Sequence, residues 1–298
     1  MKRRSYEYEK NSFYIDDTYY HFNAGSHFDR IAFTTDLFHT QYCNGFGESV
    51  ELYQIGLYAR DSVSMASQAI AQDFVTLVVG VPLLIAALCF VHKKNSIRGW
   101  FLLTGTLGYF LYTYTSYSVL CAYNHLYLIY VVLTALSFYG FFLSMSVLYR
   151  HNVKEMFSNK YPVRALSVFM FIVGLTLCVM WLGRIVPTLT NEAAPYGLEH
   201  YSTLVIQSLD LGFVVPASFV TAYLLRKRQK WGYLLSAVLV MKMLTMAAAV
   251  SAMGINMKLH SVAMGLADVI VFPIIVVINI CFLVKMLGRI KNGSLAEV

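Results

Sequence analysis

Three charged residues could do chemistry in this chain, because each lies inside a long apolar run. Lys242 lies in the middle of "VLVMKMLT", and Asp210 and Asp268 lie several residues inside two other runs. A lysine at the centre of a membrane helix costs roughly 2.5–3.5 kcal/mol on insertion scales. We therefore expect Lys242 to pair with Asp210 or Asp268. Two interpretations stay open: a buried ion pair that fixes helix packing, or charges lining an outward-facing cavity that binds an ion, a proton or a small polar solute.

Three further polar residues accompany these charges. Asp73 and Arg184 lie at the ends of apolar runs, and Gln207 precedes Asp210 by about one helical turn. All six are candidates for binding a ligand or an ion. No residue is predicted to be catalytic.

The composition indicates what kind of element must position these side chains. The chain has 298 residues, of which 58% are hydrophobic and 13% are charged, whereas soluble domains are about 25% charged. It is therefore expected to be an all-α membrane helix bundle. In a membrane protein the placement of the charges matters more than their sum. The net charge of +7 therefore does not indicate a nucleic-acid partner.

Seven apolar runs are long enough to cross a bilayer, which takes about 20 residues. We expect seven transmembrane helices within 74–291, with the lipid bilayer as partner. The oligomeric state stays open. The seven runs are 74–91, 100–122, 126–149, 165–187, 203–225, 233–254 and 264–286.

Lysine and arginine gather in every second connection between these runs. The connections after 74–91, 126–149 and 203–225 are basic, as is the stretch after 264–286, whereas the alternate connections carry few such residues. Cytoplasmic loops carry an excess of lysine and arginine. The C-terminal tail, 292–298, is therefore predicted to be cytoplasmic, in a multi-pass protein of the cell membrane. The six candidates then fall in the outer half of the bilayer or near its middle.

The region before the first span is polar. Residues 1–50 show no periodicity and are expected to be weakly ordered. Residues 51–73 are mixed enough for a helix along the outer interface, with a lead-in of little order as the alternative. No signal peptide is indicated, because no apolar stretch follows the basic start.

Two other patterns have a structural and a functional interpretation. Pro82, Pro216 and Pro273 fall inside predicted spans and favour kinks, which serve packing more often than motion. The 100–122 run carries small and hydroxyl residues at helical spacing, which commonly serve close packing. These residues are Gly105, Gly108, Tyr109, Tyr112 and Ser116.

Several function classes lack their signatures. Retinal proteins need a lysine midway along the seventh helix, but Lys285 lies at its cytoplasmic edge. The triplet and NPxxY motifs of G-protein-coupled receptors are replaced by "LYRHN" and "VINIC". HExxH and GxSxG are absent, so an enzyme is not favoured. Five cysteines without CxxC spacing indicate no metal site, and no cofactor is expected.

Four stretches carry a resemblance to a known group. They are "AQDFVTLVVGVPLL" (71–84), "GTLGYFLYTYTSY" (105–117), "SLDLGFVVP" (208–216) and "WGYLLSAVLVMKM" (231–243). Over roughly 55–290 the chain resembles uncharacterised prokaryotic polytopic membrane proteins with seven or eight helices. The resemblance implies a membrane bundle and supplies no activity. Members of the group tend to carry an additional apolar helix before the external lead-in, and residues 1–55 show no good equivalent.

Overall fold

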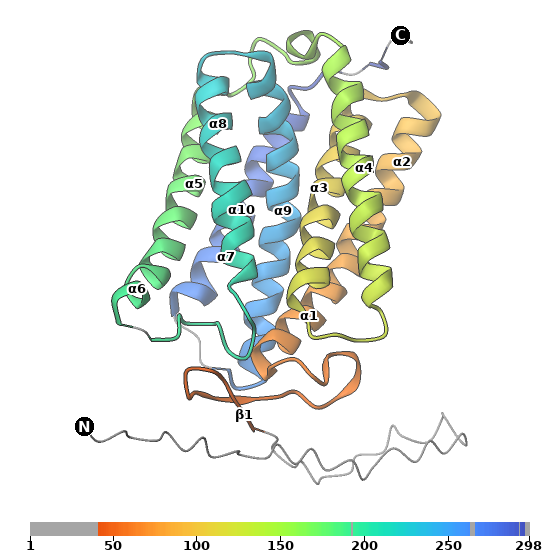
Figure 1. Cartoon of the computed structure of the whole chain (residues 1–298). Coiled ribbons are helices and arrows are strands. Elements are labelled where there is room, and N and C mark those ends of the chain that lie inside the picture. Colours follow the sequence, from red (N-terminus) through yellow and green to blue (C-terminus); the bar gives the residue numbers. More distant parts are fainter. Residues whose placement is uncertain (1–40, 192, 263–265, 292, 296–298) are drawn as a thin grey trace, which may run out of the picture. The chain divides into compact units, whose positions relative to one another are not determined.

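The structure is a computed structural model that describes residues 41–191, 193–262, 266–291 and 293–295, with 266–272 described by backbone alone (Figure 1). All of these residues belong to one compact unit, His39–Val298. The weak order predicted for residues 1–40 lies outside the described residues.

Helices make up most of the described chain, so the predicted all-α class is confirmed. In chain order they are α1 (Val63–Val75), α2 (Val81–Lys94), α3 (Ile97–Leu120), α4 (Tyr127–Arg150), α5 (Val163–Ile185), α6 (Thr188–Asn191), α7 (Val205–Leu209), α8 (Val215–Arg226), α9 (Lys230–Leu259) and α10 (Leu266–Leu287). One antiparallel pair of strands, β1 (Gln41–Cys43) and β2 (Ser49–Glu51), precedes them.

Five helical stretches of the described chain are long and apolar enough to cross a membrane, which supports a membrane protein. They are Val63–Lys94, Tyr127–Arg150, Val163–Thr190, Val205–Arg226 and Lys230–Leu259. The last of these, α9, packs against α1, α3, α8 and α10 and is the most buried of the five. The count of seven spans and the side of the C-terminus stay predictions.

The helix α3 has the length of a span but a more polar composition. Its hydroxyl side chains Thr104, Thr106, Thr113 and Ser116 are buried, because α2, α4 and α9 all pack against it. Gly105 allows the approach to α9: a Cβ at this position would lie 2.4 Å from the Cβ of Met241. Inside such a bundle, polar groups can find partners that lipid does not offer.

The sequence favours a helix over 51–73, but only the part from Val63 onward is α-helical. Gln54 and Gly56 have positive φ angles of 64° and 65°, which no helix continues through. The helix begins only at Val63, where the Ser62 side chain accepts a hydrogen bond from the Met65 N–H. From there it runs without a break into the first span, Val63–Lys94.

Two spans contain a wide π turn directly before a proline. In the first π turn, Thr76–Gly80, the Val81 N–H donates to the Thr76 carbonyl, and Pro82 follows. In the second π turn, Asp210–Val214, the Val215 N–H donates to the Asp210 carbonyl, and Pro216 follows. The kinks expected at these two prolines thus take the form of π turns, since proline has no N–H to continue the ladder.

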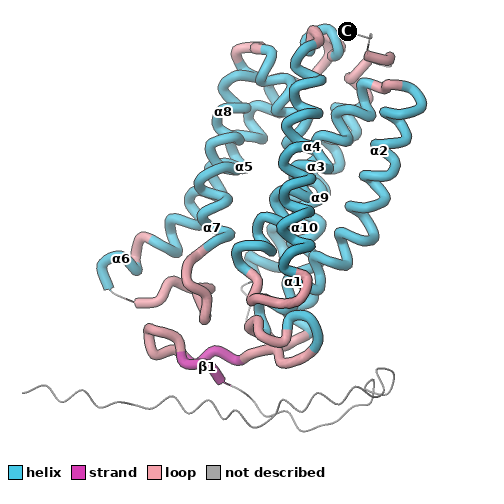
Figure 2. Tube along the Cα trace, turned by 45° about the vertical axis from the view of Figure 1, so that its right-hand side comes forward, coloured by secondary structure: helices cyan, strands magenta, loops and turns pink. Residues whose placement is uncertain are grey.

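The β1–β2 hairpin lies beside the start of α1 (Figures 1 and 2). At the same end of the bundle, the buried Asp61 carboxylate links three connecting segments through hydrogen bonds. Its Oδ1 accepts hydrogen bonds from the Ala122 N–H at 2.8 Å and from the Tyr201 O–H at 2.9 Å. Burial raises the pKa of the Asp61 carboxyl above its usual value, against the lowering effect of these two donors. This carboxylate ties the α1 entrance to the α3–α4 connection and to the segment before α7.

At the opposite end, the segment after α10 ties two loops together. The Ile97 N–H donates to the Gly293 carbonyl at 3.1 Å, and the Leu295 N–H donates to the Asn95 carbonyl at 2.9 Å. On the other side, the Lys291 N–H donates to the Met156 carbonyl at 2.8 Å. The same segment therefore bridges the α2–α3 and α4–α5 connections.

Candidate intramembrane site

Asp210 lies inside the bundle with both carboxylate oxygens hydrogen-bonded. The Tyr112 O–H donates to Oδ1 and the Trp181 Nε1–H donates to Oδ2, each at 2.8 Å. These donors stand on α3 and α5, so one carboxylate joins three parts of the bundle. Only 8% of Asp210 is exposed, and a buried carboxylate needs such donors. Asp210 is also the first residue of the second π turn, a distortion that is frequent at functional sites.

Lys242 lies near the middle of α9 and is 8% exposed, so its ammonium faces the interior of the bundle. The Nζ atom lies 4.0 Å from the centroid of the Tyr112 ring, within the range of a cation–π attraction. Gly108 of α3 lies beside the lysine stem: a Cβ there would lie 3.8 Å from the Lys242 Cγ, an ordinary contact distance.

The direct ion pair expected between Lys242 and Asp210 is not formed, and the alternative partner, Asp268, has its side chain outside the described residues. No described carboxylate oxygen lies within 4.0 Å of the Lys242 Nζ. Instead, Tyr112 stands between the two charges, with its ring against Lys242 and its hydroxyl on Asp210. The Asp210 carboxylate is still near enough to act on the ammonium through space. The sequence could not indicate this tyrosine because the pairing depends on how closely α3 approaches α9.

Arg184 extends the cluster toward the end of α5. Its guanidinium carbon lies 5.3 Å from the Trp181 ring centroid and 5.1 Å from the Tyr196 ring centroid. The Trp181 indole thus contacts Arg184 on its face and Asp210 through its N–H. A row of contacts runs from Arg184 through Trp181, Asp210 and Tyr112 to Lys242, and we call these five residues the Asp210 cluster.

Of two other candidates, the structure describes the side chain of Gln207 but not that of Asp268. Gln207 is buried one turn before Asp210, with 9% of its surface exposed, and its side chain makes no hydrogen bond to a described residue. Its amide lies one turn from Asp210 and has no partner in the described part of the chain. The Asp268 side chain lies outside the described residues.

Asp73 belongs to a separate group of residues. It accepts hydrogen bonds from the Tyr58 O–H at 2.7 Å and from the Tyr117 O–H at 2.9 Å. Its side chain keeps an exposed face. No described contact joins Asp73 to the Asp210 cluster, so the structure divides the six candidates between at least two places.

The first π turn has its own polar contacts with α3. The Thr76 hydroxyl pairs with the Tyr109 hydroxyl at 2.8 Å, and the Gln72 amide donates to the same tyrosine at 2.7 Å. The Gln72 amide also donates to the Thr113 hydroxyl at 2.9 Å. We call these four residues the Tyr109 cluster. It contains no ionisable acid or base of ordinary pKa near neutrality.

The residues described offer no group of three or more His, Cys, Asp or Glu side chains that could hold a metal ion. Comparison with protein-family models, curated proteins and solved structures finds no match to this chain.

Sequence reasoning missed Trp181 and ranked Tyr112 as a packing residue. Trp181 had a usable signal: it lies three residues before Arg184, on the same helix face, and a tryptophan N–H inside a span needs an acceptor. Tyr112 shared its pattern with the tyrosines on either side. Only the fold separates Tyr112, which contacts charges, from Tyr109, which contacts neutral groups.

Proposed function

We propose that this chain is a seven-span, transporter-like or sensor-like protein of the cell membrane that binds a small solute or ion at the Asp210 cluster. The observation that supports this most is the state of Lys242. Its ammonium is buried and makes a cation–π contact, yet none of its N–H donors reaches an acceptor among the described residues. A buried charge is costly unless hydrogen bonds satisfy it, so an acceptor supplied by a ligand would stabilise this ammonium.

The chemistry of the cluster favours an anionic or carbonyl-bearing ligand. Both Asp210 oxygens already accept hydrogen bonds from the chain, which leaves the carboxylate poorly placed to take a metal cation. Lys242 offers positive charge and N–H donors that have no described acceptor, and the Gln207 amide lies one turn from Asp210. A small carboxylate or halide would meet these groups. The bound ion can also be a proton, which Lys242 itself would bind and release.

Trp181 provides a direct readout of binding, because its indole lies on Asp210. In a background with Trp100→Phe and Trp231→Phe, it is the one tryptophan left. Chloride or acetate would be exchanged for sulfate at constant ionic strength while Trp181 emission is followed. We expect a saturable change that Lys242→Met abolishes. The matched control is Lys258→Met, on an exposed part of the same helix, which should respond like the parent. A normally folded Lys242→Met protein with an unchanged response would remove the proposal.

A structural or assembly role is the second candidate, and the saturation of Asp210 favours it. A carboxylate with both oxygens engaged by the chain's own donors can lock three helices together without any ligand. This alternative predicts that Asp210→Asn with Lys242→Met leaves cellular function intact while Asp210→Asn alone destabilises the fold. Binding of chloride or acetate at Trp181 would contradict it.

The topology that we propose places the basic connections in the cytoplasm. In a background without the five native cysteines, Lys93→Cys and Lys258→Cys would be treated with a membrane-impermeant maleimide. We expect labelling at position 258 in intact cells and at position 93 only after permeabilisation. The reverse pattern would invert the orientation and place the Asp210 cluster nearer the cytoplasmic side.

A further inference from the structure

Two apolar grooves flank the first turns of α5 at the end of the bundle with the basic connections. One groove, of about 570 Å³, lies between α5 and α10 and is lined by Ala165, Phe169, Ile172 and Phe282. The other, of about 620 Å³, lies between α5 and α8 and is lined by Phe171, Phe219 and Tyr223. Val168 and Arg226 line both grooves, so the two meet at one place.

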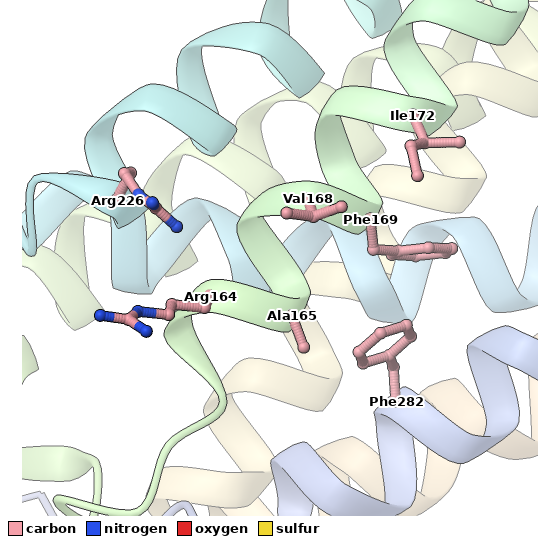
Figure 3. A pocket seen from close by; sticks show the side chains of 7 residues that line it. All are labelled: Arg164, Ala165, Val168, Phe169, Ile172, Arg226 and Phe282. Carbon is pink, nitrogen blue, oxygen red and sulfur yellow. The ribbon is translucent and has the colours of Figure 1, made fainter.

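Two arginines line the grooves at one end: Arg226 lines both grooves, and Arg164 lines the first. Arg164 stands in the first turn of α5, and Arg226 stands in the last turn of α8. Both are exposed, and neither forms a hydrogen bond or an ion pair with a described residue. Figure 3 shows both guanidinium groups at one end of the first groove, with the Phe169 and Phe282 rings farther along it. Two positive charges that have no acidic partner among the described residues suit a phosphate, which arginine binds in bidentate fashion.

We propose that this place binds one anionic diacyl phospholipid from the leaflet that faces the basic connections. The phosphate lies between Arg164 and Arg226, and one acyl chain lies in each groove, on either side of Val168. Basic pockets between spans on the cytoplasmic side recognise anionic headgroups in this way. The paired grooves favour a lipid over a free phosphate, because their linings are almost entirely apolar. This site is independent of the Asp210 cluster and of the function proposed for it.

The test compares lipids that differ only in the headgroup. The full chain, purified in a neutral detergent, is titrated with phosphatidylglycerol or with phosphatidylcholine of the same acyl chains, and bound lipid is counted by native mass spectrometry. We expect phosphatidylglycerol to bind with a stoichiometry of one at low concentration. The double variant Arg164→Gln/Arg226→Gln should weaken this binding about thirtyfold, since each basic residue near a lipid surface contributes about a fivefold step.

The matched control removes the same charge elsewhere on the same side. Lys93 and Lys94 end α2 and do not line either groove, so Lys93→Gln/Lys94→Gln should bind phosphatidylglycerol like the parent. A further variant, Ala165→Trp, fills the first groove and should weaken binding while both arginines remain. Thermal unfolding without lipid shows that each variant is folded.

Three results would overturn the proposal. Equal binding of phosphatidylcholine would show that the arginines do not select the headgroup. Equal losses in the arginine and lysine variants would show a general charge effect. Complete competition by glycerol 1-phosphate, with Ala165→Trp unaffected, would identify a soluble phosphate compound as the ligand.

Discussion

The two π turns use the same backbone arrangement to present different chemistry. Each is closed by a hydrogen bond from the residue before a proline, and each places its first side chain on a tyrosine of α3. In the first π turn that side chain is Thr76, and its partners are neutral. In the second it is Asp210, which also interacts electrostatically with the buried Lys242 ammonium.

The difference teaches that the distortion by itself does not create a functional site. The Tyr109 cluster satisfies most of its donors internally, through Gln72, Thr76 and Thr113. The Asp210 cluster satisfies the acid but leaves Lys242 without an acceptor among the described residues. The first π turn therefore serves as an internal control for the second in the same fold.

The largest expected difference in stability is between substitutions of Asp210 and of Thr76, the first residues of the two π turns. Asp210→Leu leaves the Tyr112 hydroxyl, the Trp181 indole and the Lys242 charge without their acceptor or counter-charge, and should lower the free energy of unfolding by about 3–5 kcal/mol. Thr76→Val removes one neutral hydrogen bond, while the Tyr109 hydroxyl keeps Gln72, so about 1 kcal/mol is expected. Denaturant unfolding in detergent micelles measures both. Equal losses would show that Asp210 does no more than Thr76.

An intermediate effect compares the two tyrosines. Tyr112→Phe keeps the ring beneath Lys242 but removes a donor from a charged oxygen, which should cost about 2 kcal/mol. Tyr109→Phe disturbs only neutral partners, and the Gln72 amide keeps Thr113, so about 1 kcal/mol is expected. The same unfolding measurement applies. A larger loss for Tyr109→Phe would reverse the comparison between the clusters.

The smallest effect compares a glycine in each turn. A Cβ at Gly80 would lie 3.1 Å from the Tyr109 Cε1, so Gly80→Ala should press on that ring and cost roughly 1 kcal/mol. A Cβ at Gly212 meets nothing within 4 Å, so Gly212→Ala should leave stability unchanged or slightly raised. The thermal midpoints of the two variants provide the measurement. A clear loss in Gly212→Ala would mean that the second π turn must move.

Much of the helix arrangement could be predicted from the sequence, because an apolar run of about 20 residues leaves the backbone few alternatives in lipid. The start of the first span could not be predicted from hydropathy, since Ser62 begins that helix with a local cap in a polar stretch. Lys242 and Asp210 stood out as charges among apolar neighbours. Their connection through Tyr112 could not be foreseen, because it depends on the close approach of α3 to α9 that Gly105 allows. The hydrogen bond from Trp181 to Asp210 likewise could not be foreseen, because it depends on how α5 approaches the second π turn.

The segment after α10 has a consequence for biosynthesis. Residues 289–291 and 293–295 follow α10, so they leave the ribosome after the helices α1 to α10 have been made. Yet they provide the carbonyl and amide groups that hold Asn95, Ile97 and Met156. The α2–α3 and α4–α5 connections therefore stay untied during insertion, and the helices made earlier can adjust their positions in the bilayer until this segment is made and hydrogen-bonds to both connections.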